Sequence, residues 1–152
     1  DTRIKKLENG EYDAILLSKA GIDALGFNKK ISQEFNVNEL IPCAGQGIIA
    51  MQCRDNDNDM KNILEKINNE ESRILANAER EVLKILEGDC DTAIGVYAKI
   101  ENEKINLKTE LFSVDGSKRY FMNESDEINS FLSLSQRIGK QLKSESKGSY
   151  KK

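Results

Sequence analysis

The sequence contains no histidine, a single proline (Pro42) and only three cysteines among its 152 residues. Without histidine, the chain lacks the commonest general base, the Ser-His and Cys-His catalytic designs and the usual ligands of most zinc sites. Any acid–base chemistry must therefore use carboxylates, lysine or tyrosine, and we expect no metal site.

The cysteines, Cys43, Cys53 and Cys90, are odd in number and widely spaced, which is not typical of a disulfide framework. A reducing compartment is expected: the cytoplasm or, as the alternative, a plastid-type organelle. The net charge is −3 with both signs intermixed, so no basic face for nucleic acid is predicted. No apolar run is long enough to span a membrane, and the opening residues lack the apolar region of a signal peptide.

The first half of the chain has the rhythm of a parallel α/β layer. A short helix is predicted over 2–8, a buried strand over 12–18 and a helical turn from Lys19 that Gly26 stops. A second apolar strand is predicted over 48–53, and the next helix places Met60, Ile63, Leu64 and Ile67 on one face. Two strands are too few for a parallel sheet, so we interpret the chain as the C-terminal portion of a longer protein.

The second half predicts a small α+β unit with a three-stranded antiparallel sheet. A helix with Ile74, Leu75, Ala78, Val82 and Leu86 in register precedes it. Strands are predicted in AIGVYAKI, KINLKTELF and KRYFMN, with a hairpin signal at Asp115-Gly116 between the second and third. An amphipathic helix with Ile128, Phe131, Leu132, Ile138 and Leu142 on one face closes the unit, and residues 144–152 are predicted to be a disordered tail.

Cys90 lies in the polar stretch EGDCDT, directly after a predicted helix. A buried inert thiol would suit an apolar run better. A reactive thiolate is disfavoured by the helix C-terminus and by Glu87, Asp89 and Asp91. A metal site lacks further ligands. The remaining reading is a neutral thiol that captures a carbon electrophile and keeps it as a thioether.

Three other features have a functional and an ordinary interpretation. The stretch PCAGQGI, Pro42 to Ile48, could let the backbone approach a ligand or could be a tight connection. Arg3 could clamp a carboxylate, although a solvated surface arginine is favoured from the residues alone. The charged AERE, containing Glu79 and Glu81, is interpreted as a solvated face with local ion pairs.

Together these segments resemble porphobilinogen deaminase, also called hydroxymethylbilane synthase. The resemblance is carried by TRIKKLENGEYDAILLSKAGIDALGF, PCAGQGIIAMQCR, ILANAEREVLKILEGDCDTAIGVYAKI and LFSVDGS, in the family's order and spacing. It is most specific around Cys90, where the family pattern runs AER, a short apolar helix, LEGGC and then IG.

The resemblance implies an enzyme of tetrapyrrole (haem) biosynthesis with three domains. It would polymerise four porphobilinogen units into hydroxymethylbilane with release of ammonia, primed by a dipyrromethane cofactor. The first two domains would be α/β, similar to type 2 periplasmic binding proteins. Residues 1–44 would be the later part of domain two, 45–69 a return segment of domain one, and 70–143 the α+β cofactor-anchoring domain.

The family's functional residues carry over to a few positions. Cys90 would hold the dipyrromethane covalently, with Gln46 and Gly47 as supporting cofactor contacts. Arg3, Ser18 and Gly21 would lie at the substrate. The acid–base aspartate and most of the arginine cluster would lie upstream, so we expect no catalytic residue within this chain, inactivity in isolation, and a monomer at full length.

The sequence departs from the family pattern at Ala24, where arginine is usual, at Asp89, which replaces a glycine, and over 91–93. Two rivals therefore remain: a catalytically dead homologue and a non-enzymatic solute-binding module of similar fold.

Overall fold

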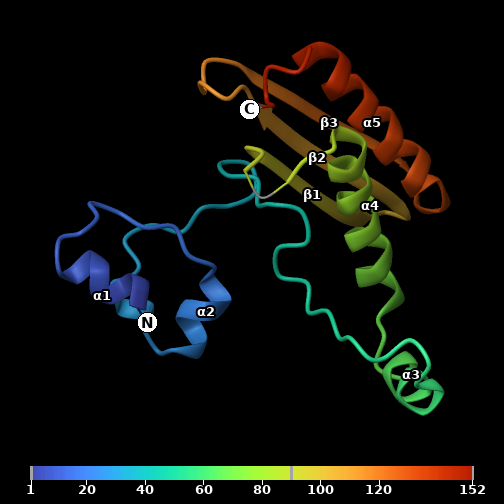
Figure 1. The fold of residues 1–152 in the computed structure, drawn as a ribbon, viewed down its shortest axis with the longest axis horizontal. Helices are drawn as coiled ribbons and strands as arrows, with labels where there is room; N and C mark the ends of the chain where they lie inside the picture. The colour runs from blue at the N-terminus through green and yellow to red at the C-terminus, as the bar shows by residue number, and fades with distance from the viewer. Residues whose placement is uncertain (1, 90, 152) are drawn as a thin grey trace. The chain divides into compact units, whose positions relative to one another are not determined.

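The computed structural model describes residues 2–89 and 91–151, and Cys90 lies outside them. The chain divides into two units, residues 1–35 and 36–152. Figure 1 shows the elements of both.

The first unit contains only short helices. Helix α1 spans Thr2–Glu8, α2 spans Lys19–Ala24, and a 3₁₀ turn, η1, spans Asn28–Lys30. Ile4 and Ile22 are its buried aliphatic side chains. Helix α2 ends at Ala24 and is followed by Leu25 and then Gly26. The φ of Gly26, 70°, lies in the left-handed region that glycine adopts without strain, which agrees with the prediction that Gly26 stops the helix.

The two strands predicted over 12–18 and 48–53 are wrong for this structure, in which neither segment has strand geometry. Their side chains are exposed: Leu16 keeps 66% of its surface and Ile49 keeps 87%. A strand needs neighbours that take up its backbone N–H and C=O groups. Among the described residues, no strand lies beside either segment to pair with its backbone, so the apolar pattern alone does not produce a strand.

The second unit is the predicted α+β unit. Helices α3 (Asn58–Glu65) and α4 (Glu70–Leu86) precede strands β1 (Ile94–Glu101), β2 (Lys104–Phe112) and β3 (Arg119–Glu127). A 3₁₀ turn, η2 (Ile128–Ser130), leads into helix α5 (Phe131–Ser146). The strands form an antiparallel sheet in the order β1-β2-β3, which confirms the prediction.

Helices α4 and α5 lie side by side on one face of the sheet (Figure 1). The predicted α4 face is confirmed, with Ala78, Val82 and Leu86 fully buried. The predicted α5 face is wrong at Leu132, which is 46% exposed, because the helical period from Phe131 brings Leu134 inward instead. At Gly139 a Cβ atom would meet Ile85 Cβ at 2.8 Å, so this glycine allows the two helices to approach closely.

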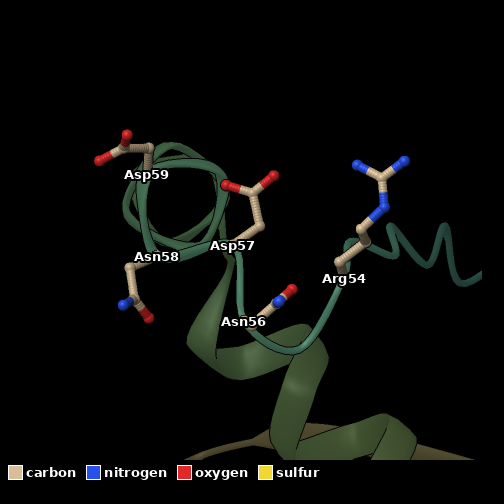
Figure 2. Close-up of a pocket in the computed structure, with 5 residues that line it drawn as sticks. All are labelled: Arg54, Asn56, Asp57, Asn58 and Asp59. Carbon is tan, nitrogen blue, oxygen red and sulfur yellow. The ribbon is translucent and has the colours of Figure 1, made fainter.

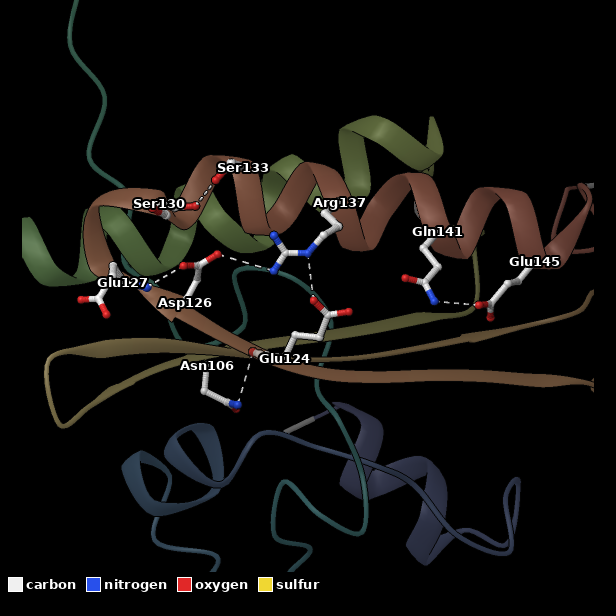
Figure 3. A network of polar contacts seen from close by, with 9 residues as sticks. All are labelled: Asn106, Glu124, Asp126, Glu127, Ser130, Ser133, Arg137, Gln141 and Glu145. Atoms are coloured by element: carbon white, nitrogen blue, oxygen red, sulfur yellow. Dashed lines mark hydrogen bonds and ion pairs between the residues drawn. The ribbon is translucent and has the colours of Figure 1, made fainter.

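Arg137 on α5 forms ion pairs with strand β3. Its Nε donates to Glu124 Oε2 at 3.0 Å and its Nη2 to Asp126 Oδ2 at 3.5 Å (Figure 3). Both acceptors lie on β3. All three side chains are partly exposed, so the pairs fix orientation more than they add stability.

The prediction of a disordered tail over 144–152 is wrong for the described part. Helix α5 continues to Ser146, and the Ser149 carbonyl accepts from Val114 N at 2.9 Å. Tyr150 is only 4% exposed and donates its hydroxyl to the Leu86 carbonyl at 2.9 Å.

Thr109 contains a buried hydroxyl with no hydrogen-bond partner among the described residues. It lies on the core face of β2 beside Ile105, Leu107 and Leu111, all fully buried, and opposite Val96 on β1. We expect Thr109→Val to raise the free energy of unfolding by about 1–3 kcal/mol, because it removes an unsatisfied group and keeps the shape. Urea unfolding followed by circular dichroism measures this.

The matched control is the reverse change at the paired position, Val96→Thr, which should lower the free energy of unfolding. A lower stability of Thr109→Val would show that the hydroxyl has a partner after all.

Candidate functional site

The residues predicted at the site divide between the two units. Arg3, Ser18 and Gly21 belong to residues 1–35, and Gln46 and Gly47 belong to residues 36–152. Cys90, the predicted anchor, lies outside the described residues. The structure therefore describes two partial sites, and each is taken by itself.

Ser18 and Gly21 are brought together at the start of α2. The Ser18 carbonyl accepts from Gly21 N at 3.1 Å and from Ile22 N at 3.3 Å. A Cβ atom on Gly21 would lie 3.3 Å from Ser18 Oγ, so glycine keeps that hydroxyl uncovered. The Ser18 side chain makes no capping bond and is exposed, which leaves it able to bind a ligand.

Arg3 projects from α1 with its side chain exposed. Within 2–89 and 91–151 no residue pairs with its guanidinium. Such an arginine is able to bind a carboxylate in bidentate fashion, and also matches the ordinary surface interpretation.

The stretch from Ile41 to Ile48 is a pair of consecutive turns. Gln46 N donates to Cys43 O and Ile48 N donates to Gly45 O, both at 3.1 Å. Gly45 and Gly47 have φ values of 76° and 85°, which explains why glycine occupies both positions. Gln46 and Gly47 are exposed, and Cys43 Sγ donates to Gln46 Oε1 at 3.3 Å.

Glu79 holds this turn against the α+β unit, and the interpretation of Glu79 as part of a solvated face is wrong. Its side chain is 7% exposed. Oε2 accepts from Gly45 N at 2.6 Å, and Oε1 accepts from Ala98 N on β1 at 2.9 Å. One carboxylate on α4 thus joins the Gly45 turn, the helix and the first strand.

The electrostatics of Glu79 combine two opposing effects. Burial raises the pKa of its carboxyl above the ordinary 4.5, and the Ala98 and Gly45 amides lower it in part. One signal in the sequence could have found it. Glu79 precedes Val82 by three residues and Leu86 by seven, which places it at the edge of the apolar face.

Two more contacts fix the Ile41–Pro42 end of the turn. Ile41 N donates to Glu110 Oε1 at 3.3 Å, and Val96 N donates to the Pro42 carbonyl at 2.8 Å. A Cβ on Gly95 would lie 2.6 Å from the Ile41 carbonyl, so only glycine permits this approach. The exposed Gln46-Gly47 tip therefore projects from a rigid base.

The loop that leads into and out of Cys90 is held by Asp89. Its Oδ1 accepts from Asp91 N at 2.9 Å and from Thr92 Oγ1 at 3.2 Å, while Asp89 N donates to Thr92 Oγ1 at 3.1 Å. The Asp91 amide is the main cause that lowers the pKa of the Asp89 carboxyl, so Asp89 is ionised near neutral pH. Asp89 therefore places a negative charge on the residue directly before Cys90.

Two open hollows lie elsewhere and contain none of the predicted site residues. One, of about 530 Å³, is lined by Arg54, Asn56, Asp57, Asn58 and Asp59 (Figure 2). The other, of about 510 Å³, shares Arg54 and Asp57. Asp57 Oδ1 already caps α3 by accepting from Met60 N at 3.0 Å. In the described part of the chain no three His, Cys, Asp or Glu residues are placed to hold a metal ion, and no helix is both long and apolar enough to cross a membrane.

Comparison with known proteins gives a consistent result over most of the chain. Residues 1–62 match the family model described as porphobilinogen deaminase, dipyromethane cofactor binding domain. Residues 73–145 match the model described as porphobilinogen deaminase, C-terminal domain. A porphobilinogen deaminase of Coxiella burnetii is 40% identical over 115 residues, which are 76% of this chain and 38% of that protein. One of Francisella tularensis is 41% identical over 117 residues, 77% of this chain and 39% of that protein. The chain thus spans less than two-fifths of the length of these relatives.

We expect Glu79→Gln to destabilise the α+β unit by roughly 1–3 kcal/mol at pH 7, because an amide group supplies only one acceptor for two backbone donors. The effect should depend on pH. A folded pKa above the unfolded value means that the folded state binds more protons, so the stability that Glu79 contributes decreases as pH rises through that window. The difference between the unaltered chain and the variant should be largest below pH 4.5, the ordinary pKa of the carboxyl, and should decrease toward pH 7. Urea unfolding over this pH range measures it.

Glu81→Gln is the control, because the Glu81 carboxylate contacts the side chains of Gln136 and Lys84 and no described backbone amide. A difference for Glu79→Gln that grows with pH would contradict the raised pKa.

Proposed function

The chain belongs to the porphobilinogen deaminase family, and from this premise we propose that it is part of a transferase of tetrapyrrole biosynthesis. The full-length protein would join four porphobilinogen units into hydroxymethylbilane and release one ammonia for each. The match of two consecutive family domains, in order, to residues 1–62 and 73–145 is the observation that carries this proposal.

Cys90 would hold the cofactor. A thioether C–S bond would form between its sulfur and the aminomethyl carbon of a porphobilinogen unit. The C–N bond of that carbon would break, and the amino group would leave as ammonia with the thiol proton. The attached dipyrromethane would supply the primer to which the pyrroles are added. The described neighbours fit this role, since the ionised Asp89 and the helix end before it favour a neutral thiol and a stable thioether.

The remaining site residues would contact the pyrroles. The exposed Gln46 and Gly47, on a turn fixed by Glu79, suit a supporting contact with the cofactor. Arg3 would bind an acetate or propionate group, and the uncovered Ser18 hydroxyl beside Gly21 would lie near it on the substrate side. No catalytic acid or base is assigned within this chain; that aspartate would come from the preceding part of the protein.

The first 69 residues would fold fully only with the rest of the protein. Residues 1–44 and 45–69 would belong to α/β domains similar to type 2 periplasmic binding proteins, in which 12–18 and 48–53 become strands. Three apolar surfaces support this: Tyr12 and Leu16 are exposed, Ile49 and Met51 are exposed, and α3 exposes Met60 and Ile63. Residues 70–143 would form the C-terminal cofactor-anchoring domain, and the full-length protein would be a cytoplasmic monomer.

A catalytically dead homologue is the second candidate. It is favoured by Ala24, which replaces the arginine usual in the family at the exposed end of α2. A dead homologue would not build a cofactor, so the two candidates differ in the mass of the protein.

The test is an intact mass under denaturing conditions of the full-length protein after exposure to porphobilinogen. We expect an added mass of two linked pyrroles that maps to the peptide containing Cys90, and a colour reaction with Ehrlich-type reagent. Cys90→Ala should lose both and all turnover. Cys43→Ala and Cys53→Ala are matched controls that should keep the added mass.

An unmodified full-length protein would favour the dead homologue. Full turnover by Cys90→Ala would refute the anchor.

The isolated chain should not convert porphobilinogen at a measurable rate, because the upstream acid and most carboxylate-binding arginines are missing from it. Hydroxymethylbilane formation by the 152 residues alone would contradict the assignment of those groups to the preceding part.

A further inference from the structure

The end of helix α4, directly before the Cys90 loop, is fully satisfied in its hydrogen bonding. The last four carbonyls of a helix have no partner within it. Here Leu83 O accepts from Gly88 N and Lys84 O accepts from Glu87 N, each at 3.0 Å. The last two carbonyls are taken by groups from the end of the chain: Ile85 O accepts from Lys143 Nζ at 3.2 Å, and Leu86 O from the Tyr150 hydroxyl at 2.9 Å.

The charges at this point are balanced by the same segment. Glu87 caps α4 with a φ of 55°, and its carboxylate meets Lys143 Nζ at 3.1 Å and Lys151 Nζ at 2.6 Å. The hydrogen bond from Lys151 is the largest cause that lowers the pKa of Glu87, followed by the one from Lys143. Two cations therefore offset one carboxylate and the negative end of the helix dipole.

The final residues are themselves anchored on the sheet side. Ser149 O accepts from Val114 N at 2.9 Å, and Ser149 Oγ lies 3.1 Å from the Tyr120 hydroxyl on β3. Tyr150 is 4% exposed and belongs to the core cluster. Because this segment is bonded both to the sheet side and to Leu86, it holds the end of α4 at a fixed place relative to the sheet.

We propose that Lys143, Tyr150 and Lys151 form a C-terminal clamp that positions the cofactor-anchoring loop. This rests on the proposed function, because the loop matters only if Cys90 holds the dipyrromethane. The clamp residues touch α4 rather than the substrate, so they act as positioning residues.

The geometry of the loop explains why its starting point is critical. Gly88 N bonds back to Leu83 O, and a Cβ on Gly88 would meet Leu83 Cδ1 at 2.7 Å, so the chain leaves the helix along one tightly packed path. Strand β1 begins at Ile94, which fixes the other end. With so few residues between, a shift of the last turn of α4 must move Asp89, the residue directly before Cys90.

Tyr150→Phe tests the clamp, since it keeps the packed ring and removes only the hydroxyl. In the 152-residue chain, amide hydrogen exchange at Glu87 and Gly88 should become about threefold to tenfold faster, the effect of one lost hydrogen bond. Exchange at Val82, one turn before the end of the same helix, should not change. Tyr97→Phe, on β1, is the matched control and should leave all three amides unchanged.

The second readout is cofactor loading in the full-length protein, measured as the initial rate at which the Cys90 peptide gains the dipyrrole mass. At a temperature well below the melting temperature of every variant, Tyr150→Phe and Lys143→Ala/Lys151→Ala should load several-fold more slowly, and Tyr97→Phe at the normal rate. Equal loading rates, or exchange at Val82 that accelerates as much as at Gly88, would overturn the clamp while leaving the proposed function standing. An unaltered protein that gains no mass on Cys90 would overturn the proposed function, and the clamp's role with it.

Discussion

The contact of helices α4 and α5 with one face of the antiparallel sheet determines the place of every functional feature in residues 36–152. Ala78, Val82 and Leu86 of α4 are fully buried in this contact, as are Leu134, Ile138 and Leu142 of α5. Because α4 is held in place by this packing, the Glu79 carboxylate on the helix reaches the Gly45 turn. The C-terminal end of the same helix is the start of the Cys90 loop. A helix that could rotate or slide would move both features at once.

Hydrogen bonds from polar groups fix α4 in addition to its apolar packing. The Glu79 carboxylate takes two backbone donors that would otherwise be buried without partners, one on the turn and one on β1. At the end of the same helix, Tyr150 and Lys143 take the last two carbonyls. In each case a distant part of the chain supplies the missing partner, so the turn, the helix and the final residues form one hydrogen-bonded assembly around the sheet.

The sequence predicts the α+β unit well because its signals are local. The alternation of Ile105, Leu107, Thr109 and Leu111 matches their burial, and the hairpin at Asp115-Gly116 forms. The turn between β1 and β2 has no such signal, since Asn102 and Glu103 adopt positive φ without a glycine.

The strands expected over 12–18 and 48–53 fail for another reason: a strand depends on neighbouring strands, and apolar residues do not reveal whether those neighbours belong to the chain. The sequence does not reveal the roles of Glu79 and Tyr150, because each bonds a residue far away in the chain. Glu79 bonds Gly45, and Tyr150 bonds Leu86. The residues around Cys90 could be recognised by family resemblance, while Arg3, Ser18 and Gly21 remain predictions.

The exposed run from Ile48 to Cys53 has a consequence for how the polypeptide must be produced. It is uncharged, contains no proline and presents Ile49 and Met51 to solvent. Short apolar segments of this kind are templates for cross-β association between copies. Solubility of the 152 residues thus depends on how dilute they are kept, and synthesis together with a covering chain is the natural way to avoid inclusion bodies.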